Sequence, residues 1–249
     1  MVRLTKDGIT LENNQVDQVD AIVYATGWRP SYETFFDVDQ AADLGLSVLT
    51  RNTLPEAKSK YQDGDNVAET EILQEFPALR DPPRNVSSMA NSRFTPFRLY
   101  RYMVPTNPTK YPGIVFLGHL AVGNNFRASE VQAMWAMAYL EKFPNPLSTA
   151  KASPPKIRST PLSLPDQPKM EDEVARQVAW NRVRYLSKGQ QGVWLYYDLV
   201  SYTDRLLEDL GLSSSYRARH SRWANLWKAY VAEDLRGLLD ELIRRLQHG

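Results

Sequence analysis

The stretch VDAIVYATG, residues 19–27, carries the strongest single prediction about the fold. Apart from Asp20 its first six residues are apolar, and the run closes on the triplet ATG. Near-continuous apolarity is typical of a parallel strand that is covered on both faces. Residues 19–24 are therefore predicted to form a buried strand, with the small triplet at its carboxyl end.

A second unit of the same kind lies downstream. The apolar residues 114–117 predict another short strand, which ends at Gly118 and leads into a loop. A helix is predicted over residues 127–143, where Ser129 and Gln132 have the S-x-x-Q spacing of a capping box. Strand, glycine, loop and helix make half of a βαβ unit. The chain is therefore predicted to be an α/β protein whose two buried strands lie close together in one sheet.

Other patterns surround these two units. Residues 2–12 alternate apolar and polar side chains on both sides of an Asp-Gly pair, which is a hairpin signal. A helical candidate lies at about residues 67–76. Seven of the 16 prolines fall within residues 144–168, which predicts an extended linker. Helical spacing returns beyond it, and Gly211 is placed to end one of these helices as its C′ residue.

The composition excludes several classes of protein and of site. The 249 residues contain no cysteine, which excludes disulfides, thiolate metal sites and a cysteine nucleophile. Three histidines without metal-ligand spacing argue against a His-built metal site. A net charge of +1 gives no reason to expect nucleic acid as a partner. No signal peptide or apolar span is visible, so the expectation is a cytoplasmic protein without a transmembrane segment.

Glycine spacing bears directly on nucleotide binding. None of the 12 glycines lies two residues from another, so neither the G-x-G-x-x-G fingerprint nor a phosphate loop of that type is present. No GxSxG elbow or persuasive Ser/His/Asp set supports a hydrolase either.

Four segments nevertheless share an order and an approximate spacing with a known family. They read DAIVYATGW at residues 20–28, RLYRYMVP at 98–105, YPGIVFLG at 111–118 and E-x-Q-A-x-W at 130–135. With the preceding hairpin, they resemble the C-terminal third of a flavin-containing (dimethylaniline-type) monooxygenase, over roughly residues 2–142. The resemblance implies an incomplete FAD/NAD(P)-binding sheet with a β-hairpin layer and a C-terminal helical extension.

The resemblance also implies a chemistry. FAD and NADP would be the cofactors, and a C4a-(hydro)peroxyflavin would insert one oxygen atom from O2 into a soft N or S heteroatom or a ketone of a small-molecule substrate. A strand that ends in glycine lets backbone amides approach a ligand, and a helix N-terminus beside the flavin would stabilise its reduced form. No catalytic side chain and no metal ligand is assigned. The residues expected to bind the cofactor are Ala25, Thr26, Gly27, Gly118, His119, Asn124, Asn125, Phe126 and Gln132.

Departures from the family lead to a further expectation. Both G-x-G-x-x-G motifs are missing, so the chain is expected to be a truncated piece of such an enzyme, inactive alone and weak in retaining FAD. Its expected organisation is the C-terminal part of an FAD-binding domain over residues 1–143, a proline-rich linker over 144–168 and a helical extension over 169–249. The alternative function is a non-catalytic remnant or pseudoenzyme that acts as a protein-interaction module and self-associates through an exposed sheet edge.

Purely structural roles remain open as alternatives for several of these residues. Gln132 serves equally well as a capping residue, His119 as a structural hydrogen-bonding group, and Asn124 and Asn125 as turn formers.

Overall fold

The computed structural model describes most of the chain in separate segments. They are residues 3–5, 8–10, 16–17, 32–49, 55–82, 94–123, 125–143, 162–212 and 236–248. The chain divides into two units, Met1–Ser31 and Tyr32–Gly249. The predicted strand at residues 19–24 and the triplet Ala25, Thr26 and Gly27 lie outside the described residues.

The first unit contains three short strands. These are β1 (Arg3–Thr5), β2 (Gly8–Thr10) and β3 (Val16–Asp17), in the sheet order β1-β2-β3. Both pairings are antiparallel. Gly8, the glycine of the predicted hairpin signal, is the first residue of β2 and pairs with Thr5 of β1.

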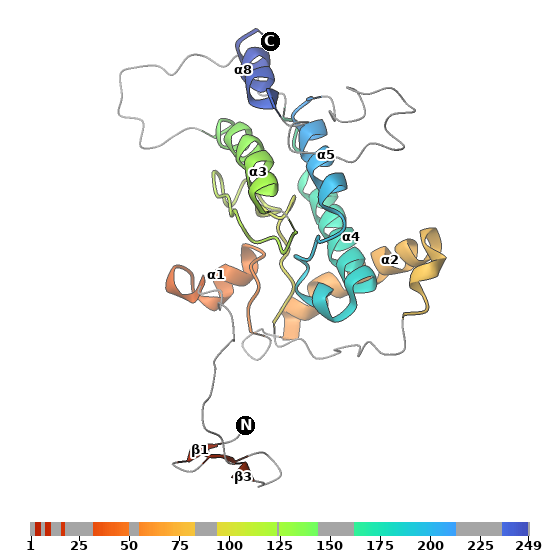
Figure 1. Cartoon of the computed structure of the whole chain (residues 1–249). Coiled ribbons are helices and arrows are strands. Elements are labelled where there is room, and N and C mark those ends of the chain that lie inside the picture. The colour runs from red at the N-terminus through yellow and green to blue at the C-terminus, as the bar shows by residue number, and fades with distance from the viewer. Residues whose placement is uncertain are drawn as a thin grey trace. The chain divides into compact units, whose positions relative to one another are not determined.

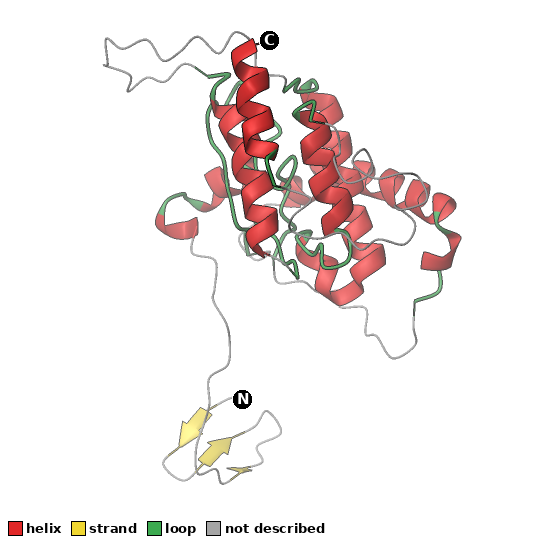
Figure 2. Cartoon of the chain, turned by 45° about the horizontal axis from the view of Figure 1, so that its top comes forward, coloured by secondary structure: helices red, strands yellow, loops and turns green. Residues whose placement is uncertain are grey.

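Helices make up most of the described second unit (Figure 2). The α-helices are α1 (Val38–Asp43), α2 (Pro55–Glu75), α3 (Asn125–Leu140), α4 (Gln167–Tyr185), α5 (Leu199–Asp209) and α8 (Leu238–His248). Three short 3-10 helices join them, η1 (Tyr32–Thr34), η2 (Pro77–Leu79) and η3 (Leu186–Gln191). In the described part of the chain, no helix has both the length and the apolar composition needed to cross a bilayer.

The predicted α/β fold class, with its incomplete FAD/NAD(P)-binding sheet and hairpin layer, is therefore wrong. Residues 114–117, the predicted second strand, form no strand. Their apolar character has another cause, because Val115 packs on one hydrophobic cluster while Ile114 and Phe116 pack on another. A short apolar run that fills the space between two clusters has the same pattern as a buried strand. Self-association through an exposed sheet edge is not tested and stays a prediction.

Local sequence signals account well for the helix ends. Pro55 opens α2, where its missing N–H costs nothing. The predicted C′ role of Gly211 is confirmed: its φ is 64°, and it follows α5 and Leu210. The Gly211 amide donates to the Glu208 carbonyl and the Leu212 amide to the Leu207 carbonyl, which is the hydrogen-bond pattern of a Schellman motif.

The predicted helix after residue 126 is also present, but its start and cap differ from the prediction. α3 begins at Asn125, so Ser129 lies inside the helix and the predicted capping box with Gln132 is wrong. The apolar residues that indicated the helix do face the core. The outer side of the helix, however, also carries apolar side chains, such as Met137, which is 59% exposed.

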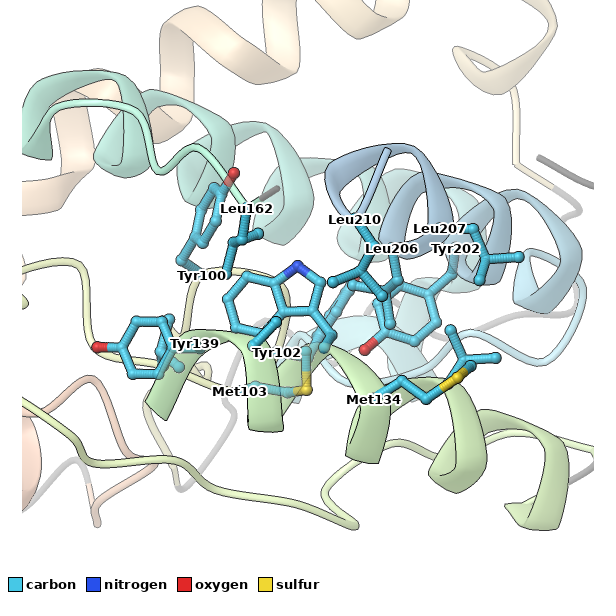
Figure 3. Packing of buried hydrophobic residues seen from close by; sticks show 14 of the residues in the cluster. Tyr100, Tyr102, Met103, Met134, Tyr139, Leu162, Tyr202, Leu206, Leu207 and Leu210 are labelled. Atoms are coloured by element: carbon cyan, nitrogen blue, oxygen red, sulfur yellow. The ribbon is translucent and has the colours of Figure 1, made fainter. Parts of the chain in front are cut away.

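The main core lies between α3, α4 and α5. α3 packs beside α5, and α2 packs against α4 (Figure 1). Figure 3 shows side chains of α3, of α5 and of the loop before them filling one common layer. Trp135 and Tyr139 are fully buried there, with stacked rings 5.5 Å apart. Burying a side chain of this size stabilises the fold by roughly 1.5–3 kcal/mol.

Residues from both sides of the predicted linker contribute to this core. Buried members before it include Tyr100 and Met103, and members after it include Leu206, Leu210 and Leu242. The C-terminal helices therefore share a hydrophobic cluster with the RLYRYMVP segment, residues 98–105.

Candidate functional site

The loop that precedes α3 is anchored at two points. At its start the Phe116 amide donates to the Met103 carbonyl at 2.8 Å. Further along, the Ala121 amide donates to the Val193 carbonyl, and the Ala121 carbonyl accepts from the Leu195 amide, at 2.9 and 3.0 Å. Because backbone hydrogen bonds hold both places, the residues between them have a defined conformation.

Gly118 lies between these anchors and has a conformation that suits glycine. Its φ is 79°, in the left-handed region that side chains with a Cβ avoid. A Cβ built at Gly118 would meet nothing within 4 Å, so the space in front of it is open. The neighbouring Leu117 is half exposed. A ligand can therefore approach the backbone of the loop here.

The start of α3 presents an apolar side chain to the surface. Phe126 is 89% exposed, the most exposed of the large apolar side chains described. Asn125, the first residue of α3, is exposed beside it, and the first-turn amides of a helix have no partner within the helix. A Cβ added to Gly123, just before the helix, would lie 3.5 Å from the ring of Tyr196. The helix start thus combines amide donors with an uncovered aromatic ring.

Tyr32 and His119 form a second element of this region. Tyr32 Oη and His119 Nδ1 are 2.6 Å apart. The imidazole also contacts the rings of Phe97 and Phe116, at centroid distances of 5.2 and 5.9 Å. Burial lowers the pKa of His119 and raises the pKa of Tyr32 to about 12, so both side chains are neutral near pH 7.

Gln132 lies apart from the open side of this region. Its side chain is 1% exposed, and its Nε2 donates to Tyr202 Oη at 2.8 Å. Tyr202 Oη in turn donates to the Arg101 carbonyl at 3.0 Å. Burial raises the pKa of Tyr202, which keeps the phenol protonated as a donor. Gln132 therefore joins α3 to α5 and to the loop inside the core.

Arg101 is the centre of this buried network, and the sequence analysis missed it. Its guanidinium lies against two carboxylates, with Nη1 2.5 Å from Glu173 and Nε 2.7 Å from Asp209. Trp135 Nε1 also donates to Asp209, at 3.0 Å. Burial works to lower the pKa of Arg101, but the hydrogen bond and the charge of Asp209 raise the pKa overall. A single arginine inside the apolar, aromatic stretch LYRYM was the signal that could have identified it.

Arg101 and Tyr102 have an unusual backbone. Their φ angles are 53° and 59°, two consecutive left-handed residues that carry side chains. Such a conformation costs roughly 1–3 kcal/mol per residue, so surrounding interactions must hold it. The ion pairs of Arg101 and the hydrogen bond from Asn181 Nδ2 to Tyr102 Oη supply them.

A surface pocket of about 410 Å³ adjoins this network between α4 and α5. Its lining residues are Arg101, Tyr102, Glu173, Arg176, Gln177, Trp180, Leu195, Asp198, Ser201, Tyr202 and Arg205. Both of its carboxylates are held by arginine, Glu173 by Arg101 and Asp198 by Arg184. Within the described segments no group of three His, Asp or Glu side chains is placed to hold a metal ion.

The structure thus brings four of the predicted cofactor residues into two adjacent stretches of one segment. Gly118 and His119 lie in the loop, and Asn125 and Phe126 begin α3. Gln132 lies in the core instead, and Asn124 falls outside the described residues, as do Ala25, Thr26 and Gly27.

Sequence comparison identifies relatives over nearly the whole chain. It is 28% identical over 235 residues to an FAD-dependent monooxygenase of Aspergillus sclerotiorum, a match that covers 94% of this chain and 37% of that protein. It is 30% identical over 247 residues to an FAD-dependent monooxygenase of Alternaria brassicicola, covering 96% of this chain and 38% of that protein. A third such protein, from Aspergillus versicolor, is 29% identical over 254 residues, covering 92% and 33%.

These matches confirm the predicted relationship to flavin-dependent monooxygenases at the level of the general family. The chain spans less than two fifths of the length of the relatives that it matches. No family model matches the chain, and no solved structure does.

Proposed function

We propose that this chain, whose relatives are FAD-dependent monooxygenases, forms the part of such an enzyme that covers one edge of the flavin ring. The surface that meets the ring would be the loop at Gly118 together with the start of α3. One observation carries the proposal: Phe126 is 89% exposed at a helix start, beside a loop whose glycine has open space in front of it. Burial of an uncovered aromatic side chain by a flat ring is favourable.

The described residues fit one end of FAD better than the other. A flat aromatic ring matches Phe126 and the half-exposed Leu117, and the amides of the first turn of α3 match a carbonyl or a negative charge at the ring edge. The pyrophosphate end needs closely spaced glycines, and the sequence contains no G-x-G. The proposal therefore concerns the ring end, and the phosphates would be held by residues outside this chain.

Bound FAD would supply the activation of O2 and the transfer of electrons from NADPH. The residues of this chain would shape the surroundings of the flavin ring. Phe126 and Leu117 would exclude water from the ring edge, and the positive end of α3 would stabilise negative charge there. The proposed reaction is oxygenation of a soft nitrogen or sulfur atom, or of a ketone, and its only support is the dimethylaniline-type resemblance of the sequence.

A chimera tests the proposed activity. The segment of the Aspergillus sclerotiorum protein that this chain matches is replaced by this chain, and flavin content and NADPH-dependent O2 uptake are measured. The proposal predicts a yellow protein that takes up O2, with flavin content reduced by Phe126→Ser and unchanged by Met137→Ser. Met137 is the matched control because it is an exposed apolar residue of the same helix, three turns away.

The outer side of α3 favours a second candidate, a protein-interaction module without catalysis. Phe126, Met137 and Leu140 lie on one side of the helix and are 89%, 59% and 43% exposed. An apolar stripe of this kind suits a partner chain as well as a cofactor. A chimera that folds but holds no flavin and takes up no O2 would favour this candidate over the first.

A further inference from the structure

Tyr32 and His119 form a hydrogen-bonded pair. Its role is not explained by the flavin face alone, which is the proposed surface made of the loop at Gly118 and the start of α3. Tyr32 belongs to η1, and His119 lies 87 residues later, directly after Gly118. The 2.6 Å contact joins Tyr32 Oη to one particular ring nitrogen, Nδ1. Phe97 and Phe116 contact the imidazole as well, so the ring is held in one orientation by its neighbours.

The direction of this hydrogen bond follows from acidity. A phenol is a much stronger acid than the N–H of a neutral imidazole, and an imidazole nitrogen is a better acceptor than a phenol oxygen. Tyr32 therefore donates and His119 Nδ1 accepts. The single proton of the neutral ring is then left on Nε2, which becomes a donor of fixed position. Burial favours this neutral state, because it lowers the pKa of His119.

The Nε2–H group has no partner among the described residues. The hydrogen bond to Tyr32 uses Nδ1, and the imidazole is only partly buried. In the preceding residue, Gly118, a Cβ would meet nothing within 4 Å, so there is open space at the backbone next to His119 in sequence. A neutral donor of this kind favours an uncharged acceptor such as a carbonyl oxygen, since it brings no positive charge to attract a phosphate.

We propose that Tyr32 is a positioning residue that fixes His119 as an Nε2–H donor to a carbonyl oxygen of a ligand bound over Gly118. The inference rests on the proposed function, because a flavin ring carries such carbonyls at its edge. The same chemistry would suit the carbonyl of a ketone substrate. His119 contributes a hydrogen bond in both cases, and it transfers no proton.

The tautomer is tested by NMR of the whole chain labelled with 15N-histidine. The chain has only three histidines, so His119→Gln assigns the signal of interest. The proposal predicts the Nε2–H pattern for His119, and a shift toward a mixture of tautomers in Tyr32→Phe. Tyr111→Phe is the matched control, because Tyr111 packs on the same cluster but its hydroxyl donates to Asp43. It should leave the His119 pattern unchanged. A His119 that carries its proton on Nδ1 overturns the proposal.

The ligand is tested in the same spectra with two probes. Lumiflavin, which is the flavin ring without its phosphates, and cyclohexanone are titrated separately. Flavin fluorescence reports the binding of lumiflavin, and the His119 signals report the effect of either probe. Saturable movement of the His119 Nε2 signal is expected with lumiflavin. Loss of one hydrogen bond in His119→Phe should weaken binding by roughly 10-fold.

The outcomes separate this inference from the proposed function. If lumiflavin binds and neither probe moves the His119 signals, the inference fails and the flavin face stands. If cyclohexanone alone moves them and lumiflavin does not bind, the donor role stands on the substrate side and the flavin face fails. If neither probe moves them, the inference is overturned.

Discussion

The guanidinium of Arg101 and the carboxylate of Asp209 form a two-point ion pair between residues 108 positions apart in the sequence. Nε lies 2.7 Å from Oδ2, and Nη2 lies 3.1 Å from Oδ1. The side chains are 11% and 15% exposed. This pair ties the end of α5 to the loop whose backbone is left-handed at Arg101, and therefore fixes the loop against the main core.

Asp209→Asn should strongly destabilise the fold. The change leaves a buried arginine with a weaker partner on that side, and breaking such a pair costs about 3 kcal/mol. Urea unfolding followed by circular dichroism measures the loss. Lys169→Ala is the control, because its ion pair with Asp166 is 3.6 Å long and both side chains are mostly exposed. Equal stability of Asp209→Asn and the native chain would show that the pair contributes nothing.

Gln132→Leu should lower stability without weakening flavin binding. The substitution removes the donor to Tyr202 Oη inside the core, and losing a buried hydrogen bond of this kind costs about 1–2 kcal/mol. Thermal unfolding and a lumiflavin titration are measured side by side. If flavin affinity falls while stability holds, Gln132 belongs to the binding surface and its core role is refuted.

Two glycine substitutions should have effects of opposite sign. A Cβ at Gly189 would lie 1.8 Å from the carbonyl oxygen of Asn181, so Gly189→Ala should prevent normal packing of α4 against η3. A Cβ at Gly64 in α2 would lie 3.8 Å from the Cβ of Ala175, an ordinary contact. Gly64→Ala should therefore stabilise the helix by up to about 1 kcal/mol. The melting temperatures of both variants are compared with that of the native chain. A Gly189→Ala protein as stable as the native chain would contradict the packing described.

Acid should destabilise the fold partly through His119. Burial lowers its pKa in the folded state, so below about pH 6.5 the unfolded chain binds the proton more readily and stability falls as pH falls. The titratable side chain in contact with the ring is Tyr32, and the other contacts described are Phe97 and Phe116. Urea unfolding between about pH 5 and pH 7 should show a shallower pH dependence in His119→Gln than in the native chain. If the stability of His119→Gln and of the native chain depended on pH to the same extent, the imidazole would be exposed to solvent rather than buried.

Local sequence signals predicted the local structure well. The left-handed Gly211 after α5 follows from the rule that glycine ends helices, and the apolar spacing after residue 126 indicated α3. Both ends of α3 lie within three residues of the predicted bounds. The helix predicted at about residues 67–76 covers only the second half of α2, which begins at Pro55, so its start was missed.

Long-range packing was the part that the sequence could not supply. Residues 114–117 were predicted as a strand because they are apolar, but whether such a run pairs with a strand or fills a gap between helices depends on distant partners. Arg101 was overlooked for the same reason, since its partners Glu173 and Asp209 lie beyond residue 168. Resemblance located the loop and the start of α3 as a candidate site, but the core position of Gln132 became visible only with Tyr202 placed against it.

Binding of a flavin ring by this chain is the sharpest test of whether the start of α3 faces the flavin. Lumiflavin is titrated with the purified chain, with Phe126→Ser and with Met137→Ser, and the quenching of flavin fluorescence is measured. The account predicts weak, saturable binding by the native chain and by Met137→Ser, and an affinity roughly 10-fold lower in Phe126→Ser, since one aromatic contact is lost. A folded native chain that leaves the fluorescence unchanged, or equal losses in the two variants, would contradict the claim that the start of α3 faces the flavin.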